Sequence, residues 1–118
     1  MKEYDLKVRT KQFALTIIRL FRSLPKLPDA QVIGKQLLRS GTSVGAQYRE
    51  VCRPRSDAEF ISKMTSALQE LDETAYWLEL LIEGKFVDAV KLEELIDETD
   101  QLTAIFVTSI KTKKSKMN

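Results

Sequence analysis

Hydrophobic residues recur at helical spacing in four segments of the chain, separated by short polar connections. The first segment runs from Leu6 to Leu24, with apolar side chains three or four positions apart and cationic residues between them. This is the pattern of a helix with one buried face. Pro25 ends the segment because proline cannot continue the helical hydrogen-bond ladder. The second segment starts near Asp29 and ends before Pro54.

The two later segments carry their own boundary signals. Ser56, followed by Glu59 three residues later, forms a capping box that predicts the start of a third helix directly after the serine. Gly84 is a candidate left-handed C-cap residue for that helix. Asp88 is a candidate cap for the fourth helix, which leads into the lysine-rich segment KTKKSKMN at 111–118.

Four amphipathic helices of about 20 to 27 residues, each about 30 to 40 Å long, predict an all-α fold. Short connections between them favour an antiparallel up-down-up-down four-helix bundle. The composition, 43% hydrophobic and 31% charged, is ordinary for a globular protein. We therefore expect residues 1–118 to form a single domain with a basic C-terminal tail that begins at about residue 111.

Several classes of function are disfavoured by what the sequence lacks. No apolar run approaches the roughly 20 residues that cross a bilayer, and the N-terminal residues lack the apolar segment of a signal peptide, so we expect a cytoplasmic protein without membrane contact. The chain has no histidine and one cysteine, Cys52, which removes the commonest metal ligand and general base. We therefore expect that the protein is not an enzyme and that it binds neither a metal ion nor a cofactor.

The second segment contains an unusual run of small residues, LLRSGTSVGAQYRE, from Leu37 to Glu50. Each glycine inside a helix lowers the stability of the helix by about 1 kcal/mol relative to alanine. We therefore expect a compensating role for these small residues. Gly41, Ser43 and Gly45 would leave a groove in which a neighbouring helix backbone comes close or a bulky side chain inserts. A phosphate-binding glycine loop is disfavoured, because such loops join a strand to a helix.

That run, together with RSDAEFISKMTSALQELDETAYWLELL, resembles the family of four-helix-bundle proteins encoded by intervening sequences of bacterial large-subunit (23S) ribosomal RNA genes. The shared features are arginine-serine before the small residues, Tyr48 and Glu50 after them, and the segment from Glu73 to Leu78; this chain has Gln47 where many relatives have asparagine. The resemblance implies a non-enzymatic homo-oligomer, typically a pentameric ring. A more distant resemblance to the accessory variability determinant of diversity-generating retroelements implies nucleic acid and a reverse transcriptase as partners.

The charges of the chain are distributed unevenly. Residues 1–55 contain 12 Lys and Arg against 4 Asp and Glu, whereas residues 56–118 contain 7 against 13. The expected topology brings the start of the first helix, the second connection and the end of the last helix to one basic pole. Clustered cations bind phosphate and release its counterions, with little sequence preference. The candidate nucleic-acid-binding residues at this pole are Lys7, Arg9, Lys11, Arg49, Arg53, Arg55, Lys111, Lys113, Lys114 and Lys116.

An alternative explanation for the basic pole is purely structural. Cations complement the carbonyl end of the last helix and pair with nearby acids. The antiparallel register of the second and third helices predicts an Arg49–Glu59 pair, an Arg39–Glu70 pair and a pair of Lys35 with Asp72 or Glu73. Arg53, Arg55 and the tail lysines are expected to lack such partners, which makes them the better candidates for phosphate contact.

Three large apolar residues of the third helix, Tyr76, Trp77 and Leu80, extend beyond its main stripe. A bundle interior needs only one face, so a second apolar face indicates a contact with another subunit. A broad core-facing stripe is the alternative. The same face is also compatible with a protein-binding adaptor, in which Trp77 recruits a partner such as a reverse transcriptase.

Overall fold

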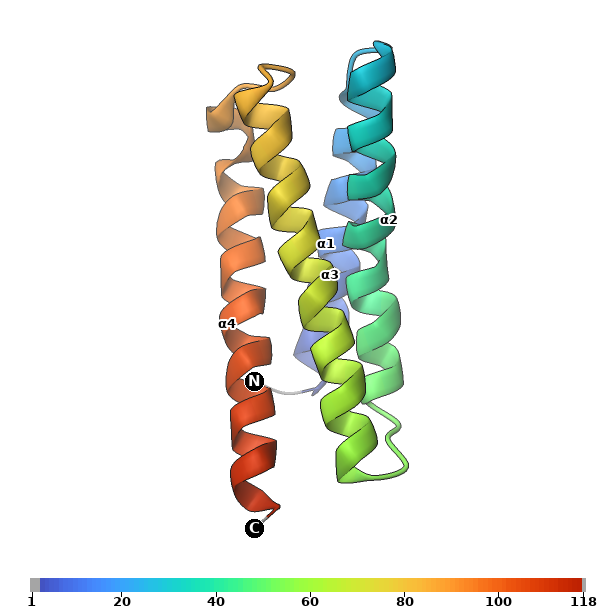
Figure 1. The fold of residues 1–118 in the computed structure, drawn as a ribbon, viewed down its shortest axis with the longest axis vertical. Helices are drawn as coiled ribbons and strands as arrows, with labels where there is room; N and C mark the ends of the chain where they lie inside the picture. Colours follow the sequence, from blue (N-terminus) through green and yellow to red (C-terminus); the bar gives the residue numbers. More distant parts are fainter. Residues whose placement is uncertain (1–2, 118) are drawn as a thin grey trace.

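Four long helices, successive ones antiparallel, make up the chain in a computed structural model that describes residues 3–117 and the side chains of residues 5–117 (Figure 1). The elements are α1 (Glu3–Ser23), α2 (Pro28–Val51), α3 (Asp57–Glu83), the short 3-10 helix η1 (Ala89–Leu92) and α4 (Glu93–Lys116). The described residues contain no strand, and the bundle measures 50 × 22 × 21 Å. The predicted all-α up-down-up-down bundle is confirmed.

The core runs along the axis of the bundle and draws on every long helix. Ile17, Leu37, Leu71 and Leu102 are each fully buried, one from each of the four helices. Tyr48 of α2 stacks on Phe106 of α4 with ring centroids 5.8 Å apart. The apolar stripes seen in the sequence are therefore the faces that meet in the core.

Glycines of α2 bring α1 and α2 close together. A β-carbon on Gly34 would lie 2.6 Å from Leu24 Cδ1, and one on Gly45 would lie 3.2 Å from Thr10 Oγ1. Gly41 is buried on the same line of the helix. The missing side chains therefore set the spacing of this helix pair. α1 and α4, by comparison, contact each other much less than the other neighbouring pairs do.

The start of α3 follows the predicted capping motif. Ser56 Oγ accepts a hydrogen bond from Glu59 N at 3.1 Å, which satisfies one of the backbone donors at the helix start. The Glu59 carboxylate accepts from Arg55 N at 3.4 Å. The predicted cap at Ser56 is confirmed, with Glu59 reaching one residue further back than a standard capping box.

The end of α3 differs from the prediction in its backbone geometry. Gly84 has a right-handed φ of −77°, so its prediction as the left-handed residue was wrong. Lys85 adopts the left-handed conformation, with a φ of 63°. Gly84 is needed for space instead, because a β-carbon there would lie 2.8 Å from Leu80 O and 2.9 Å from Phe86 Cε2.

The beginnings and ends of the other helices also differ slightly from expectation. Asp88 precedes η1 and its side chain makes no capping hydrogen bond, so its prediction as the cap of the fourth helix was wrong. α2 begins at Pro28, a residue whose fixed φ suits the first helical turn. At the other end of the chain, the lysine-rich segment continues α4 as helix through Lys116.

Candidate functional site

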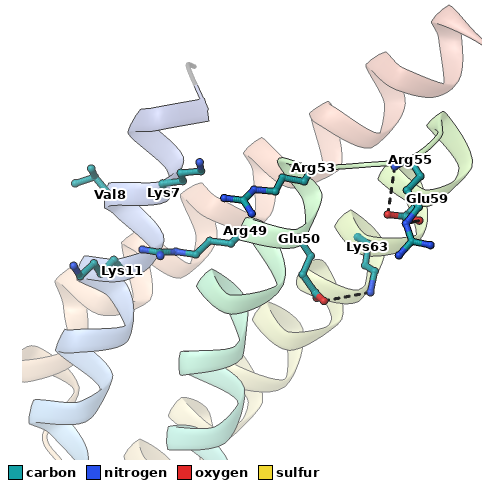
Figure 2. Close-up of a pocket in the computed structure, with 9 residues that line it drawn as sticks. All are labelled: Lys7, Val8, Lys11, Arg49, Glu50, Arg53, Arg55, Glu59 and Lys63. Carbon is teal, nitrogen blue, oxygen red and sulfur yellow. Dashed lines mark hydrogen bonds and ion pairs between the residues drawn. The ribbon is translucent and has the colours of Figure 1, made fainter.

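A basic groove lies at the end of the bundle where α1 begins and α2 passes into α3 (Figure 2). It is open to solvent and has a volume of about 780 Å³. The lining residues are Lys7, Val8, Lys11, Arg49, Glu50, Arg53, Arg55, Glu59 and Lys63. Cations therefore outnumber acids in the lining by six to two. Hereafter this set is called the basic groove.

The antiparallel packing of α1 on α2 creates the two walls of the basic groove. Lys7 and Lys11 lie on α1, and Arg49 in the last turn of α2 and Arg53 in the connection after it face them (Figure 2). Residues four apart on a helix lie about 6 Å apart along its axis and on the same side. Two rows of cations therefore face each other where Gly45 of α2 lets α1 approach.

The two acids of the basic groove are engaged by other cations. Glu50 Oε1 lies 3.5 Å from Lys63 Nζ, and Glu59 Oε2 lies 3.9 Å from Arg55 Nε. The predicted Arg49–Glu59 pair does not form, because Glu59 is held at the start of its own helix. The expectation that Arg55 lacks a partner was also wrong, although its side chain is 91% exposed.

Three cations of the basic groove remain available for a ligand. Lys11, Arg49 and Arg53 are exposed. Within residues 5–117, none of them forms an ion pair with an acid. Their charges are therefore not offset by a protein carboxylate, and a polyanion can approach them from solvent.

The lysines of α4 lie at the same end of the bundle and have different environments. Lys113 Nζ lies 3.4 Å from Asp57 Oδ1 and 4.7 Å from the centre of the Phe60 ring. The expectation that every tail lysine lacks a partner was therefore wrong for Lys113, which ties α4 to the start of α3. Lys111, Lys114 and Lys116 are exposed and do not line the basic groove.

Arg9 points away from the basic groove toward α4. Its guanidinium makes a two-pronged contact with the Glu98 carboxylate, with Nε donating to Oε2 at 3.0 Å and Nη2 contacting Oε1. Nη2 also donates to Gln101 Oε1 at 3.2 Å. Hydrogen bonding to Glu98 raises the pKa of Arg9. The structure thus gives Arg9 a role in joining α1 to α4.

Arg39 bridges α2 and α3 in the register that the sequence predicts. Its guanidinium lies 3.2 Å from Glu70 Oε2 and 2.9 Å from Glu73 Oε1, which confirms the Arg39–Glu70 pair. Burial raises the pKa of Glu70, and the charge of Arg39 opposes this rise. Ser43, one turn along α2, is half-buried, and its hydroxyl donates to Arg39 O at 2.7 Å.

The candidate interface residues of α3 differ in their exposure to solvent. Tyr76 is 52% exposed, and its ring meets Trp77 edge to face at 5.0 Å between centroids. Trp77 and Leu80 are half-buried, and Trp77 packs against the core. The buried Trp77 Nε1 has no hydrogen-bond acceptor among the described residues.

The chemistry available at the basic groove is electrostatic. Among residues 5–117, its lining contains no aromatic side chain for base stacking and one exposed apolar residue, Val8. Across residues 3–117, no cluster of three or more His, Cys, Asp or Glu side chains is placed to hold a metal ion. No helix in the same range is long and apolar enough to cross a membrane. The groove can attract phosphate groups but offers little that would distinguish bases.

Comparison with known proteins places the whole bundle in context. Residues 2–108 match the sequence profile of the 23S rRNA-intervening sequence protein family. A crystal structure of a protein of unknown function from the S23 ribosomal protein family of Bacteroides thetaiotaomicron VPI-5482 is similar, with a TM-score of 0.87 and 37% sequence identity. The similarity covers 94% of this chain and 99% of that chain. No functionally curated protein matches the sequence.

Proposed function

The chain belongs to the 23S rRNA-intervening sequence protein family, and we propose that it is a non-catalytic cytoplasmic scaffold that assembles with copies of itself and binds nucleic acid. The observation that carries the proposal is the basic groove, in which Lys11, Arg49 and Arg53 face solvent without an acidic partner among the described residues. The ligand we propose is the phosphate backbone of RNA or DNA.

The physical argument rests on the release of counterions. Each phosphate that a cation neutralises frees condensed salt ions, so binding is strong at low salt and weakens steeply as salt is added. Sequence preference requires groups that contact base edges, and the basic groove presents mainly ammonium and guanidinium groups. We therefore expect binding with little base preference, with Lys7 and the exposed lysines of α4 extending the contact.

Self-assembly would multiply the effect of a shallow site. The resemblance to relatives that form rings favours a homo-oligomer, and we propose a pentamer. If the subunits share one orientation, their basic grooves lie together at one end of the assembly. A polyanion held by one groove then meets the next at high effective concentration, so weak individual sites give useful affinity.

Light scattering tests this proposal in one experiment. The mass of the protein is measured alone and with a short RNA duplex or single strand, between about 50 and 200 mM salt, the range over which phosphate-driven affinity falls steeply. We expect a multiple of the single-chain mass that rises further when RNA is added at low salt. An assembly that gains no mass with either RNA would refute the nucleic-acid part of the proposal.

A protein-binding adaptor is the second candidate function, and the environment of Trp77 favours it. Tyr76 is exposed beside an indole whose buried Nε1 has no acceptor within the described chain. A partner carbonyl could accept that hydrogen bond. Trp77 fluorescence that stays sensitive to a soluble quencher in the assembled protein would favour recruitment of another protein over a self-assembly role.

A further inference from the structure

The opposite charges of the two halves of the sequence become opposite charges on two sides of the bundle. The α1–α2 hairpin and the α3–α4 hairpin lie side by side (Figure 1). Away from the basic groove, the first hairpin presents exposed cations, and the second presents exposed acids. We define the basic side by Arg19, Arg22 and Lys35, and the acidic side by Glu79, Asp97 and Asp100.

These charges are not neutralised by other side chains in the part of the chain that the structure describes. All six residues of the two sides are exposed, and within residues 5–117 none forms an ion pair. The predicted pair of Lys35 with Asp72 or Glu73 was therefore wrong, and Glu73 pairs with Arg39 instead. Among the described residues, their charged groups make hydrogen bonds only with neutral side chains, from Arg19 to Thr16 and from Gln101 to Asp97. Each side can therefore attract a surface of opposite charge.

Lys35 of the basic side and Glu79 of the acidic side lie at the same height along the bundle. The hydroxyls of Ser40 on α2 and Thr74 on α3 hydrogen-bond at 2.9 Å and so mark one level. Lys35 lies five residues before Ser40, and Glu79 lies five residues after Thr74. Because α2 and α3 are antiparallel, both lie about 7.5 Å from that level in the same direction.

The acidic side also contains a recess that suits a long cationic side chain. A pocket of about 220 Å³ between α3 and α4 has Glu79 and Asp100 among its lining residues. Its apolar lining comes from Ala75, Leu78, Ile82 and Ile96. Arginine and lysine place their aliphatic stems on apolar surface while the charged head meets a carboxylate, so such a pocket accepts them well.

From this geometry we infer that the acidic side of one copy docks against the basic side of the next copy, with Arg22 or Lys35 entering the recess between α3 and α4. The inference deepens the self-assembly that we propose above and rests on it. Because the two sides differ, the contact is heterologous, and it repeats from copy to copy until a ring closes. The opposite charges determine which sides of two copies meet and orient the two bundles parallel to each other.

Charge reversal and charge exchange test the inference. Glu79→Lys with Asp100→Lys places cations against cations and is expected to reduce the assembly to single chains in light scattering at low salt. Adding Arg22→Glu and Lys35→Glu to the same chain restores opposite charges and is expected to restore the wild-type mass. The control is Asp88→Lys with Glu94→Lys, which makes the same change in net charge outside the recess and should keep the assembly. Circular dichroism verifies that every variant is helical.

The outcomes separate this inference from the proposed function. A reversed variant that keeps its full mass, or a folded four-substitution variant that stays dissociated, would overturn the docking of these two sides while leaving self-assembly in place. A wild-type protein that is a single chain at every salt concentration would refute the proposed self-assembly and the inference together. Because the reversed variant and the Asp88, Glu94 control have the same net charge, a comparison of their RNA affinities shows separately whether assembly contributes to binding in the basic groove.

Discussion

Gly41 of α2 lies directly against Ile17 of α1, so that a β-carbon on the glycine would lie 2.7 Å from Ile17 Cγ1. Ile17 is fully buried and has little room to move in a densely packed interior. The two helices are therefore closer than any side chain at position 41 would allow. The same close packing holds the two cationic walls of the basic groove opposite each other.

Enlarging this contact should destabilise the bundle. Gly41→Leu is expected to lower the free energy of unfolding by about 1 to 3 kcal/mol, the usual cost of overpacking a core, and urea denaturation measures it. Ala46→Leu, an exposed position on the same helix, is the matched control and should stay within about 0.5 kcal/mol of wild type. Unchanged unfolding and unchanged mass for Gly41→Leu would contradict the packing account.

The Ser56 cap gives a local test of how α3 begins. Ser56→Ala removes the acceptor for Glu59 N and should cost about 1 kcal/mol of stability. Ser62→Ala, exposed and further along the same helix, should cost much less. Thermal unfolding of the two variants compares them, and equal midpoints would mean that the cap contributes nothing.

Arg9 and Glu98 join α1 and α4, the neighbouring pair with the least other contact. A double-mutant cycle with Arg9→Gln and Glu98→Gln should give a coupling energy of about 1 kcal/mol, at the upper end for exposed pairs because the contact is two-pronged and partly buried. Chemical denaturation of the four proteins supplies the values. A coupling energy of zero within error would show that the pair is incidental.

Replacing Trp77 distinguishes a buried Nε1 that has no hydrogen-bond acceptor at all from one that finds an acceptor on another subunit. Trp77→Phe removes the unpartnered Nε1 donor, whose burial costs about 1 to 3 kcal/mol. Removing this cost offsets part of the stability lost with the larger ring, so the free energy of unfolding of the single chain should fall less than the lost ring contacts alone predict. If Nε1 finds an acceptor on another subunit, the variant should instead lose mass in light scattering. Retained mass would exclude that hydrogen bond from the assembly.

The fold was predictable because its signals are local and repeated. Apolar spacing gave the four helices, and the Ser56–Glu59 spacing placed the start of α3. Gly84 shows the limit of such signals: glycine is required there by the nearby Leu80 carbonyl and Phe86 ring, while the left-handed turn falls on Lys85. Proximity of that kind depends on the three-dimensional path of the chain.

The cations at the basic pole show the same limit. Register alone predicted the Arg39–Glu70 pair correctly, because both residues lie well inside regular helices. It failed for Arg49 and Glu59, since the backbone at the start of α3 holds Glu59 beside Arg55. Lys11 and Arg49 line the same groove because α1 packs closely on α2. The distance between these two helices cannot be predicted from the spacing of residues along the sequence.

The most direct test of nucleic-acid binding is the salt dependence of RNA affinity for Arg49→Gln with Arg53→Gln. If both guanidiniums contact phosphate, the slope of log K against log salt should become shallower by about 1.4 to 1.8, or about 0.7 to 0.9 for each lost contact. Lys26→Gln with Lys91→Gln removes two exposed charges at the other end of the bundle and should leave the slope near the wild-type value. Equal slopes for wild type and the Arg49, Arg53 variant would contradict phosphate binding in the basic groove.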